Sequence, residues 1–237
     1  MTKLSIVILT FNTKDLTCEC LKSIFQQYEK ELQSGEFEII LIDNASKDET
    51  IKEVSNLKIP NIKIIKNKDN LGFSKGNNVG VKNATGEFVL FLNSDTEVKD
   101  KGILKMGEFL DNNKHIAILG GKLENANGST QASTGKFYSI FNLFLLLIGG
   151  ERLGLLRSSP VRISKVDWVS GACMMVKRET FEKIGGFEEK LFIYMEDHEL
   201  CFRAKEAGYL TYYYPFLSLL HKERGSKIGR ASCRERV

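Results

Sequence analysis

The chain contains apolar runs that end in clusters of polar residues. The clearest is Phe88–Leu92, which lies between Gly86 and the polar group 93–95. A short continuous apolar run with such limits predicts a strand buried on both faces, as in a parallel sheet. Ligands bind beyond the carboxyl ends of strands in open α/β sheets, so Asp95 is a candidate for a binding cleft. Asn, Ser and Asp are also ordinary turn residues, and a simple turn is the alternative.

The first ninety residues alternate between strand patterns and helical periodicity. Strand followed by helix, three times in succession, predicts right-handed βαβ units. The expected fold class is therefore α/β, with a Rossmann-like, mostly parallel central sheet and helices on both faces. The predicted strands are Leu4–Leu9, Phe37–Ile42, Ile62–Ile65 and Phe88–Leu92.

The second half is less regular and contains the most apolar segment of the chain, residues 137–148. At about twelve residues this segment is too short to span a bilayer. It predicts either a buried helix or a surface that touches the membrane or a lipid-linked acceptor. Other patterns predict strands at Ile116–Leu119, Leu191–Met195 and Tyr209–Tyr214, and helices at Arg178–Ile184 and Glu196–Gly208.

The net charge excludes an electrostatic case for nucleic acid. Residues 227–237 lack apolar periodicity and resemble the translation of a sequencing adapter, so we expect a non-native tail and a natural protein cut short soon after Ser226. Without the tail's four basic residues and one acidic residue, the formal charge falls from +4 to about +1. We therefore expect no nucleic-acid partner.

The cysteines indicate a reducing compartment. Their number is five and no CxxC pair occurs, so neither a disulfide framework nor a zinc site is indicated. The apolar run after Lys3 is too short for a signal core. We expect a cytoplasmic protein, at the inner face of the membrane if segment 137–148 contacts lipid.

Polar side chains follow each of the four predicted strands. Thr10 and Asn12 follow the first, Asp43 the second, Asn78 the third and Asp95 the fourth. Because the carboxyl ends of parallel strands share one edge of a sheet, we expect these side chains to converge on one crevice.

Two local features have structural explanations as well as functional ones. Ser46 and Glu49 have the spacing of a capping box, which predicts a helix start near Ser46. Gly72, Gly76 and Gly80 recur every four residues, which indicates backbone approach to a ligand or to the sheet.

Four motifs occur in a fixed order. They are Ser5-Ile-Val-Ile-Leu-Thr-Phe-Asn12, Ile42-Asp-Asn-Ala-Ser-Lys-Asp-Glu-Thr50, Asn70-Leu-Gly-Phe-Ser-Lys-Gly-Asn-Asn78 and Leu92-Asn-Ser-Asp-Thr-Glu97. Together they resemble family 2 glycosyltransferases with the GT-A fold, especially the rhamnosyltransferase-like branch. The resemblance implies one GT-A domain over residues 1–226. Its nucleotide-binding half would cover about 1–120, and an acceptor-side C-terminal subregion would cover about 121–226.

The resemblance also implies a nucleotide-sugar donor, linked to dTDP or UDP, and a saccharide or lipid-linked acceptor. A divalent metal, Mn²⁺ or Mg²⁺, would neutralise the leaving diphosphate. The family's Asp-x-Asp sequence begins here with Asn93, so Asp95 is its one ionised ligand, and His221 is expected to complete the metal site. The implied donor-binding residues are Thr10, Asn12, Asp43, Gly72, Asn78, Asn93 and Asp95.

On the acceptor side, Trp168 lies three residues before Gly171, and an aromatic face can pack on a pyranose ring. A core position is the alternative for Trp168. Glu196 and Asp197 begin a predicted helix, where a plain N-terminal cap would also explain them. The resemblance implies that Asp197 is the catalytic base, with Glu196 contacting acceptor or orienting the loop. We expect His198 to face solvent or to bond the loop.

Three functions remain open at this point. The first is an inverting glycosyltransferase of cell-surface polysaccharide synthesis that uses dTDP-rhamnose or a UDP-hexose. The second is a nucleotidyltransferase, which would need a Gly-rich phosphate loop after the first strand, where residues 10–13 contain no glycine. The third is a non-catalytic sugar-nucleotide-binding module, consistent with Asn93 in the metal motif.

Overall fold

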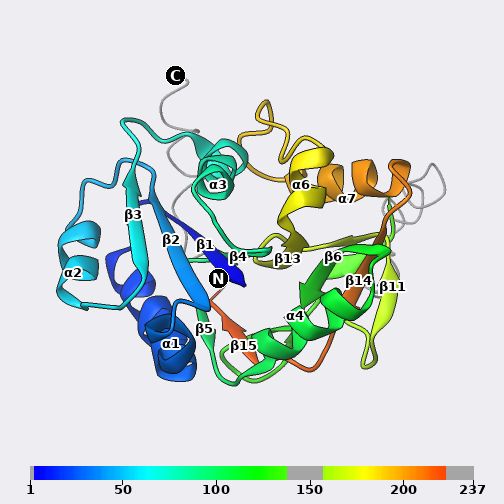
Figure 1. Cartoon of the computed structure of the whole chain (residues 1–237), viewed down its shortest axis with the longest axis horizontal. Helices are drawn as coiled ribbons and strands as arrows, with labels where there is room; N and C mark the ends of the chain where they lie inside the picture. The colour runs from blue at the N-terminus through cyan, green and yellow to red at the C-terminus, as the bar shows by residue number, and fades with distance from the viewer. Residues whose placement is uncertain (1–2, 138–156, 223–237) are drawn as a thin grey trace.

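The computed structural model describes residues 3–137 and 157–222 (Figure 1). These residues form a mixed α/β fold around an eight-stranded sheet with the order β11-β14-β6-β13-β4-β1-β2-β3. Four neighbours are parallel, namely β1 (Leu4–Thr10), β2 (Phe37–Asp43), β3 (Ile62–Lys66) and β4 (Phe88–Asn93). β6 (Ile116–Gly121) and β14 (Leu210–Tyr214) are also parallel to each other. The antiparallel strands are β13 (Cys173–Lys177), between β4 and β6, and β11 (Ser164–Val166), at the edge. The predicted fold class is confirmed.

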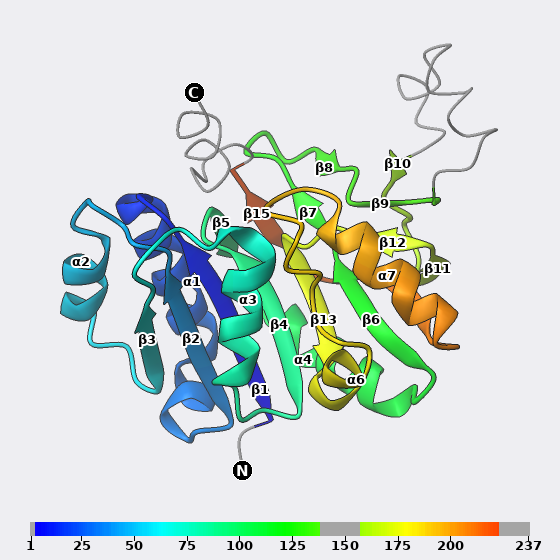
Figure 2. The same ribbon diagram turned by 90° about the horizontal axis from the view of Figure 1, so that it is seen from above.

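Helices cover both faces of this sheet. α3 (Gly72–Lys82), α6 (Arg178–Lys183) and α7 (Glu196–Glu206) lie over one face, as Figure 2 shows. α1 (Lys14–Gln33) and α4 (Gly102–Asn112) lie over the other, and α2 (Thr50–Asn56) packs on α1. Alternate residues of β1 enter different cores: Ile6 and Ile8 face α1 and α4, while Val7 and Leu9 face α3.

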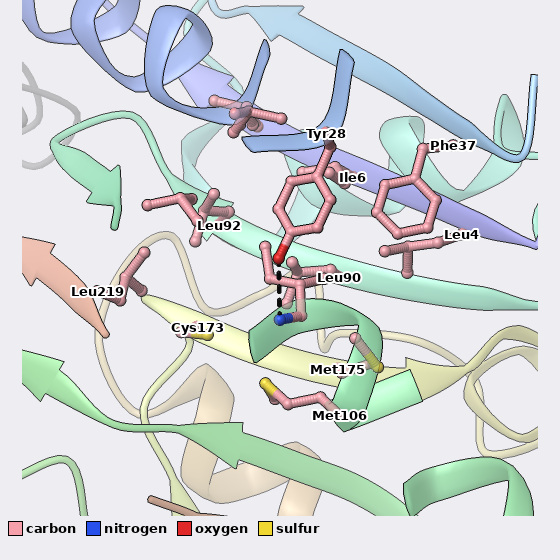
Figure 3. Close-up of a cluster of buried hydrophobic side chains, with 14 of the residues drawn as sticks. Leu4, Ile6, Tyr28, Phe37, Leu90, Leu92, Met106, Cys173, Met175 and Leu219 are labelled. Atoms are coloured by element: carbon pink, nitrogen blue, oxygen red, sulfur yellow. Dashed lines mark hydrogen bonds between the residues drawn. The ribbon is translucent and has the colours of Figure 1, made fainter. Parts of the chain in front are cut away.

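A buried tyrosine joins α1 to α4 in the first of these cores (Figure 3). The Tyr28 hydroxyl donates to the Asp100 carbonyl oxygen at 3.1 Å and accepts from the Ile103 backbone N–H at 3.1 Å. Its ring packs on Phe37 with the centroids 5.2 Å apart. Because both hydroxyl roles are satisfied, Tyr28 is buried without an uncompensated polar group.

Two small sheets lie at one end of the large sheet, opposite the N-terminus of β1 (Figure 2). The four-stranded sheet has the order β5-β15-β7-β8, and the three-stranded sheet has the order β10-β9-β12. β5 follows β4 and pairs antiparallel with β15, so that His221 lies opposite Thr96. This pairing brings the end of the described chain to the end of β4. The strands are β5 (Thr96–Val98), β7 (Leu123–Glu124), β8 (Thr130–Gln131), β9 (Thr134–Gly135), β10 (Arg157–Ser158), β12 (Trp168–Val169) and β15 (Leu219–His221).

Two local predictions were wrong. Residues 191–195 form no strand, because Tyr194 and Met195 both have positive φ, 70° and 71°, which breaks an extended backbone. Ser46 does not cap a helix: α2 begins only at Thr50, and the Ser46 hydroxyl accepts from the Asn12 backbone N–H at 2.9 Å.

Gly76 and Gly80 allow the backbone of α3 to approach the sheet closely, which is one of the two explanations predicted for the glycine spacing. A Cβ on Gly76 would meet Leu9 Cδ1 at 2.6 Å, and one on Gly80 would collide with Val7. Segment 137–148 lies outside the described residues after position 137, and the division into two halves stays a prediction. No helix in the described ranges has the length and apolarity needed to cross a membrane.

Candidate functional site

The carboxyl ends of β1, β2 and β4 lie side by side, as the strand patterns predict. Thr10 is paired with Asp43 across β1 and β2, and Leu9 with Asn93 across β1 and β4. The polar residues that end these strands therefore share one edge of the sheet.

Hydrogen bonds among the loops after β1 and β2 fix this edge. Asn12 Oδ1 accepts from the Lys47 backbone N–H at 2.7 Å, and Asp43 Oδ1 accepts from the Ser46 N–H at 3.1 Å. Thr10 is fully buried, and its hydroxyl lies 2.9 and 2.8 Å from those of Thr13 and Thr17. Thr10 thus anchors the start of α1, whereas Asn12, in the loop after β1, and Asp43, the last residue of β2, border the edge.

α3 holds the segment that leads to α7. Gly72 has a φ of +77°, and a Cβ there would meet the Phe192 carbonyl oxygen at 2.5 Å. That oxygen accepts from the Phe73 N–H at 2.7 Å. The Asn78 amide donates to the Phe187 carbonyl oxygen and accepts from its N–H, both at 2.9 Å. Gly72 and Asn78 therefore position residues 187–192.

The end of β4 and the end of β15 bring three polar side chains together. His221 Nε2 lies 3.4 Å from Asp95 Oδ1, and Asn93 Nδ2 lies 3.5 Å from the same nitrogen. Asp95 is only 3% exposed. The predicted pairing of Asp95 with His221 is thus present in the fold.

This pair fits a divalent cation as a partial ligand set. Within the described part of the chain, no group of three or more His, Cys, Asp and Glu side chains is placed to hold a metal. One carboxylate and one imidazole do converge, and this mixture suits Mn²⁺ better than Mg²⁺, which prefers oxygen alone. The remaining ligands would have to come from a bound diphosphate or water.

Asp197 lies in the first turn of α7 and accepts hydrogen bonds from three donors. Oδ1 accepts from the His198 backbone N–H at 2.8 Å and faces His198 Nδ1 at 2.9 Å. Oδ2 accepts from the Gly171 N–H at 3.2 Å. The carboxylate is therefore fixed in orientation, with its longest hydrogen bond on Oδ2.

His198 contacts this carboxylate, and Trp168 stacks on His198. Their rings stack with centroids 3.9 Å apart, and Trp168 Nε1 donates to the Lys136 carbonyl oxygen at 3.1 Å. His198 is buried, contrary to the expectation of solvent exposure, and its bond is to the candidate base itself. Trp168 is 4% exposed and one ring face is covered, which argues against the predicted acceptor platform.

Glu196 has a different environment from its neighbour Asp197. It is 6% exposed, and among the described residues its Oε2 has no hydrogen-bond partner. Burial, followed by the charge of Asp197, raises the pKa of Glu196 from 4.5 to about 7, against a smaller lowering by its own backbone N–H. The two carboxyl groups therefore differ: one is hydrogen-bonded and the other is desolvated.

A short path joins the base region to the Asp95–His221 pair. β13 lies beside β4, and the Asn93 N–H donates to the Ala172 carbonyl oxygen at 3.1 Å. The preceding residue, Gly171, donates its N–H to Asp197. Asp95 and Asp197, far apart in sequence, thus lie at the same end of the β4–β13 pair.

Sequence reasoning did not predict the contacts of three residues that organise this region. Asn44 is fully buried, and its Nδ2 donates to the Gly72 carbonyl oxygen at 3.1 Å, which ties α3 to β2. For His198 the sequence predicted solvent exposure or a bond to the loop, and its bond to the Asp197 carboxylate was not predicted. Gln131, which contacts His221, lies in a polar stretch that offered no signal.

Comparisons with known proteins agree with this fold. The profile of the family described as "Glycosyl transferase family 2" matches residues 5–185, and that of "N-terminal domain of galactosyltransferase" matches residues 160–225. The chain is 27% identical over 210 residues to the low-salt glycan biosynthesis hexosyltransferase Agl10 of Haloferax volcanii, covering 85% of this chain and 61% of that protein. It is 26% identical over 213 residues to the N-acetylglucosaminyl-diphospho-decaprenol L-rhamnosyltransferase of Mycobacterium tuberculosis, covering 79% and 67%.

Two solved structures illustrate the shared GT-A fold. GalNAc-T7 with UDP, GalNAc and Mn²⁺ has a TM-score of 0.72 at 18% identity, covering 94% of this chain and 44% of that one. S. aureus TarS 1-349 in complex with UDP-GlcNAc has a TM-score of 0.62 at 21% identity, covering 90% and 58%. The family profile covers well over half of the sequence, and relatives include rhamnosyltransferases. The chain belongs to glycosyl transferase family 2, in its rhamnosyltransferase-like branch.

Proposed function

We propose that this chain is an inverting glycosyltransferase that moves a sugar from a nucleotide-sugar donor to a hydroxyl group of a saccharide or lipid-linked acceptor, in cell-surface polysaccharide synthesis. One observation carries the proposal: Asp197 and the Asp95–His221 pair lie at the same end of β4 and β13, joined through Gly171 and Asn93. A single displacement requires the base and the diphosphate site to lie close enough to act on the same donor molecule.

The base is Asp197, acting through Oδ2. Oδ1 accepts from two donors of His198, whereas within residues 3–137 and 157–222 the one donor to Oδ2 is the Gly171 N–H, at 3.2 Å. Oδ2 takes the proton of the acceptor hydroxyl as that oxygen attacks the anomeric carbon. The bond from the anomeric carbon to the diphosphate breaks on the opposite face, and its electron pair leaves with the diphosphate. One displacement inverts the configuration.

The donor lies along the edge formed by β1, β2 and β4, with Asn12 and Asp43 on the nucleotide side and Asn93 and Asp95 near the diphosphate. Asp95 and His221 would hold a divalent ion, Mn²⁺ or Mg²⁺, which supplies positive charge to the leaving group when bound. The Mn²⁺ and UDP in the GalNAc-T7 structure support this assignment.

For the donor we propose dTDP-rhamnose first and a UDP-hexose second. The first rests on the similarity to L-rhamnosyltransferases, and the second on the hexosyltransferase relative and on TarS with UDP-GlcNAc. Thr10, Gly72 and Asn78 support the donor site through the loops that they hold.

The test measures release of nucleoside diphosphate from a panel of nucleotide sugars with Mn²⁺ and simple saccharide acceptors. Asp197→Asn is expected to lower kcat by about 10²–10⁴-fold, because general-base catalysis contributes that much, and to leave donor affinity intact. Asp111→Asn, on α4 across the sheet, is the matched control with unchanged kcat.

Three outcomes would refute the proposal. Donor binding without turnover would favour a non-catalytic sugar-nucleotide module. Pyrophosphate release from a nucleoside triphosphate would favour a nucleotidyltransferase. Full activity in Asp197→Asn would show that another group is the base.

A further inference from the structure

The Gln131 side chain, on β8, contacts His221 through two different atoms. Its Nε2 donates to the His221 carbonyl oxygen at 2.8 Å and to Asn125 Oδ1 at 2.7 Å. Its Oε1 lies 2.8 Å from His221 Nδ1. One amide therefore contacts both the backbone and the ring of the same residue.

A chain of hydrogen bonds fixes which way this amide points. The Ser129 N–H donates to Asn127 Oδ1 at 3.0 Å, and the Ser129 hydroxyl donates to the same oxygen at 2.6 Å. The Ser129 hydroxyl is then the acceptor for Asn125 Nδ2 at 2.9 Å. Asn125 Oδ1 must consequently accept from Gln131, whose NH₂ group faces two acceptors. Gln131 Oε1 is left to face the imidazole.

This arrangement determines the tautomer of His221. An amide oxygen only accepts, so His221 Nδ1 carries a hydrogen. In the neutral ring, Nε2 then presents a lone pair, and it does so 3.4 Å from Asp95 Oδ1. A lone pair and a carboxylate oxygen repel each other, and a cation between them turns this repulsion into attraction.

We propose that Gln131 is a positioning residue that selects the Nδ1–H tautomer of His221 and aims its Nε2 lone pair at a divalent cation shared with Asp95. The tautomer is a property of the metal-free chain, and its use for a cation rests on the proposed function. Histidine ligands generally donate their second N–H to an acceptor that fixes the ring, and loss of that acceptor weakens metal binding by about 10–100-fold. Here the acceptor comes from β8, outside the four motifs that identify the family.

The experiment uses the full chain and has two readouts. Nitrogen NMR of the three histidines, recorded without metal at about pH 8, distinguishes Nδ1–H from Nε2–H. His221→Asn identifies the His221 signals. Calorimetric titration with Mn²⁺ in the presence of UDP gives the affinity.

Gln131→Leu is expected to shift His221 toward Nε2–H, the tautomer favoured by histidine in water, and to weaken Mn²⁺ binding about 10–100-fold. Gln131→Glu, which keeps an acceptor for Nδ1–H, is expected to keep the Nδ1–H tautomer and most of the affinity. Gln33→Leu, a matched change at the exposed end of α1, should alter neither readout. Thermal melting of each variant separates a lost ring contact from a lost fold.

An Nε2–H tautomer in the wild-type chain would overturn the inference, as would unchanged tautomer and Mn²⁺ affinity in Gln131→Leu. If the wild-type chain transfers sugar while His221 is in the Nε2–H form, this inference fails and the proposed function stands. Absence of Mn²⁺ binding to the wild-type chain with UDP would overturn the metal role both here and in the proposed function.

Discussion

Glu196→Gln should make the protein more stable at alkaline pH and leave its stability unchanged at acid pH. Glu196 is buried beside Asp197, and its pKa is raised from 4.5 to about 7. Below 4.5 the carboxyl is protonated in both the folded and unfolded chains. As the pH rises from 4.5 to about 7, the unfolded chain releases this proton and the folded chain retains it, so the free energy of unfolding falls.

The size of this effect follows from that pH interval. Each pH unit in which the folded chain binds one more proton is equivalent to about 1.4 kcal/mol. From 4.5 to about 7 the loss would amount to about 3 kcal/mol, which is a large part of the 5–15 kcal/mol or so that stabilises a typical domain. Glutamine is neutral throughout, so Glu196→Gln should lose none of this stability.

Urea unfolding of both chains at about pH 4.5, 6 and 8 measures the difference. The advantage of Glu196→Gln should grow with pH and level off above about pH 7. Glu206→Gln, at the exposed end of the same helix, controls for general charge removal. In Asp197→Asn the pH dependence should shrink, because the second cause of the shift is gone. An advantage that stays constant or falls with rising pH would refute the reasoning.

Three further variants test other parts of the structure. His198→Leu should lower kcat about 10-fold or more with little change in KM, because Asp197 loses a side-chain donor. His198→Asn, which can still donate to Asp197, should restore much of the lost kcat. Equal kcat in the two variants would contradict this role. Glu38→Leu should cost about 2–4 kcal/mol in urea unfolding, because Glu38 accepts from Ser5 at 2.5 Å and from Thr85 N–H at 2.6 Å. Glu36→Leu, at a partly buried position directly before β2, is the comparison, and an equal loss there would count against the buried network. Gly72→Ala should lower both melting temperature and kcat through the clash with residue 192, with nucleotide affinity retained, and a selective loss of nucleotide affinity would instead show direct donor contact.

The parallel half of the sheet was predictable from the sequence. β1, β2 and β4 are mostly apolar, with Ser5 and Glu38 as the polar residues inside β1 and β2. Every residue up to the last apolar position is buried, and each strand ends in a polar residue. A run of apolar residues of this kind indicates that the strand is buried on both faces. A repeated strand–helix order then allows only a few sheet topologies. The convergence of Thr10, Asp43 and Asn93 at one edge followed from these rules alone.

Local patterns failed where the backbone left standard geometry. Residues 191–195 are apolar enough for a strand, yet Tyr194 and Met195 adopt the left-handed region directly before α7. The helix start predicted near Ser46 was wrong because the Ser46 hydroxyl bonds to the loop after β1. In both cases contacts with distant segments outweighed the local preference.

The sequence by itself determined the family, the strand edge and the candidate residues Asp95, Asp197 and His221, because motifs and apolar periodicity are local properties. Only the tertiary structure decided which groups act on one another. It paired β15 with β5 so that His221 meets Asp95, and it placed Gln131 on the far side of that ring. Hydrogen bonding and desolvation depend on neighbours far away in the chain, and for that reason the difference between Asp197 and Glu196 is absent from the sequence pattern.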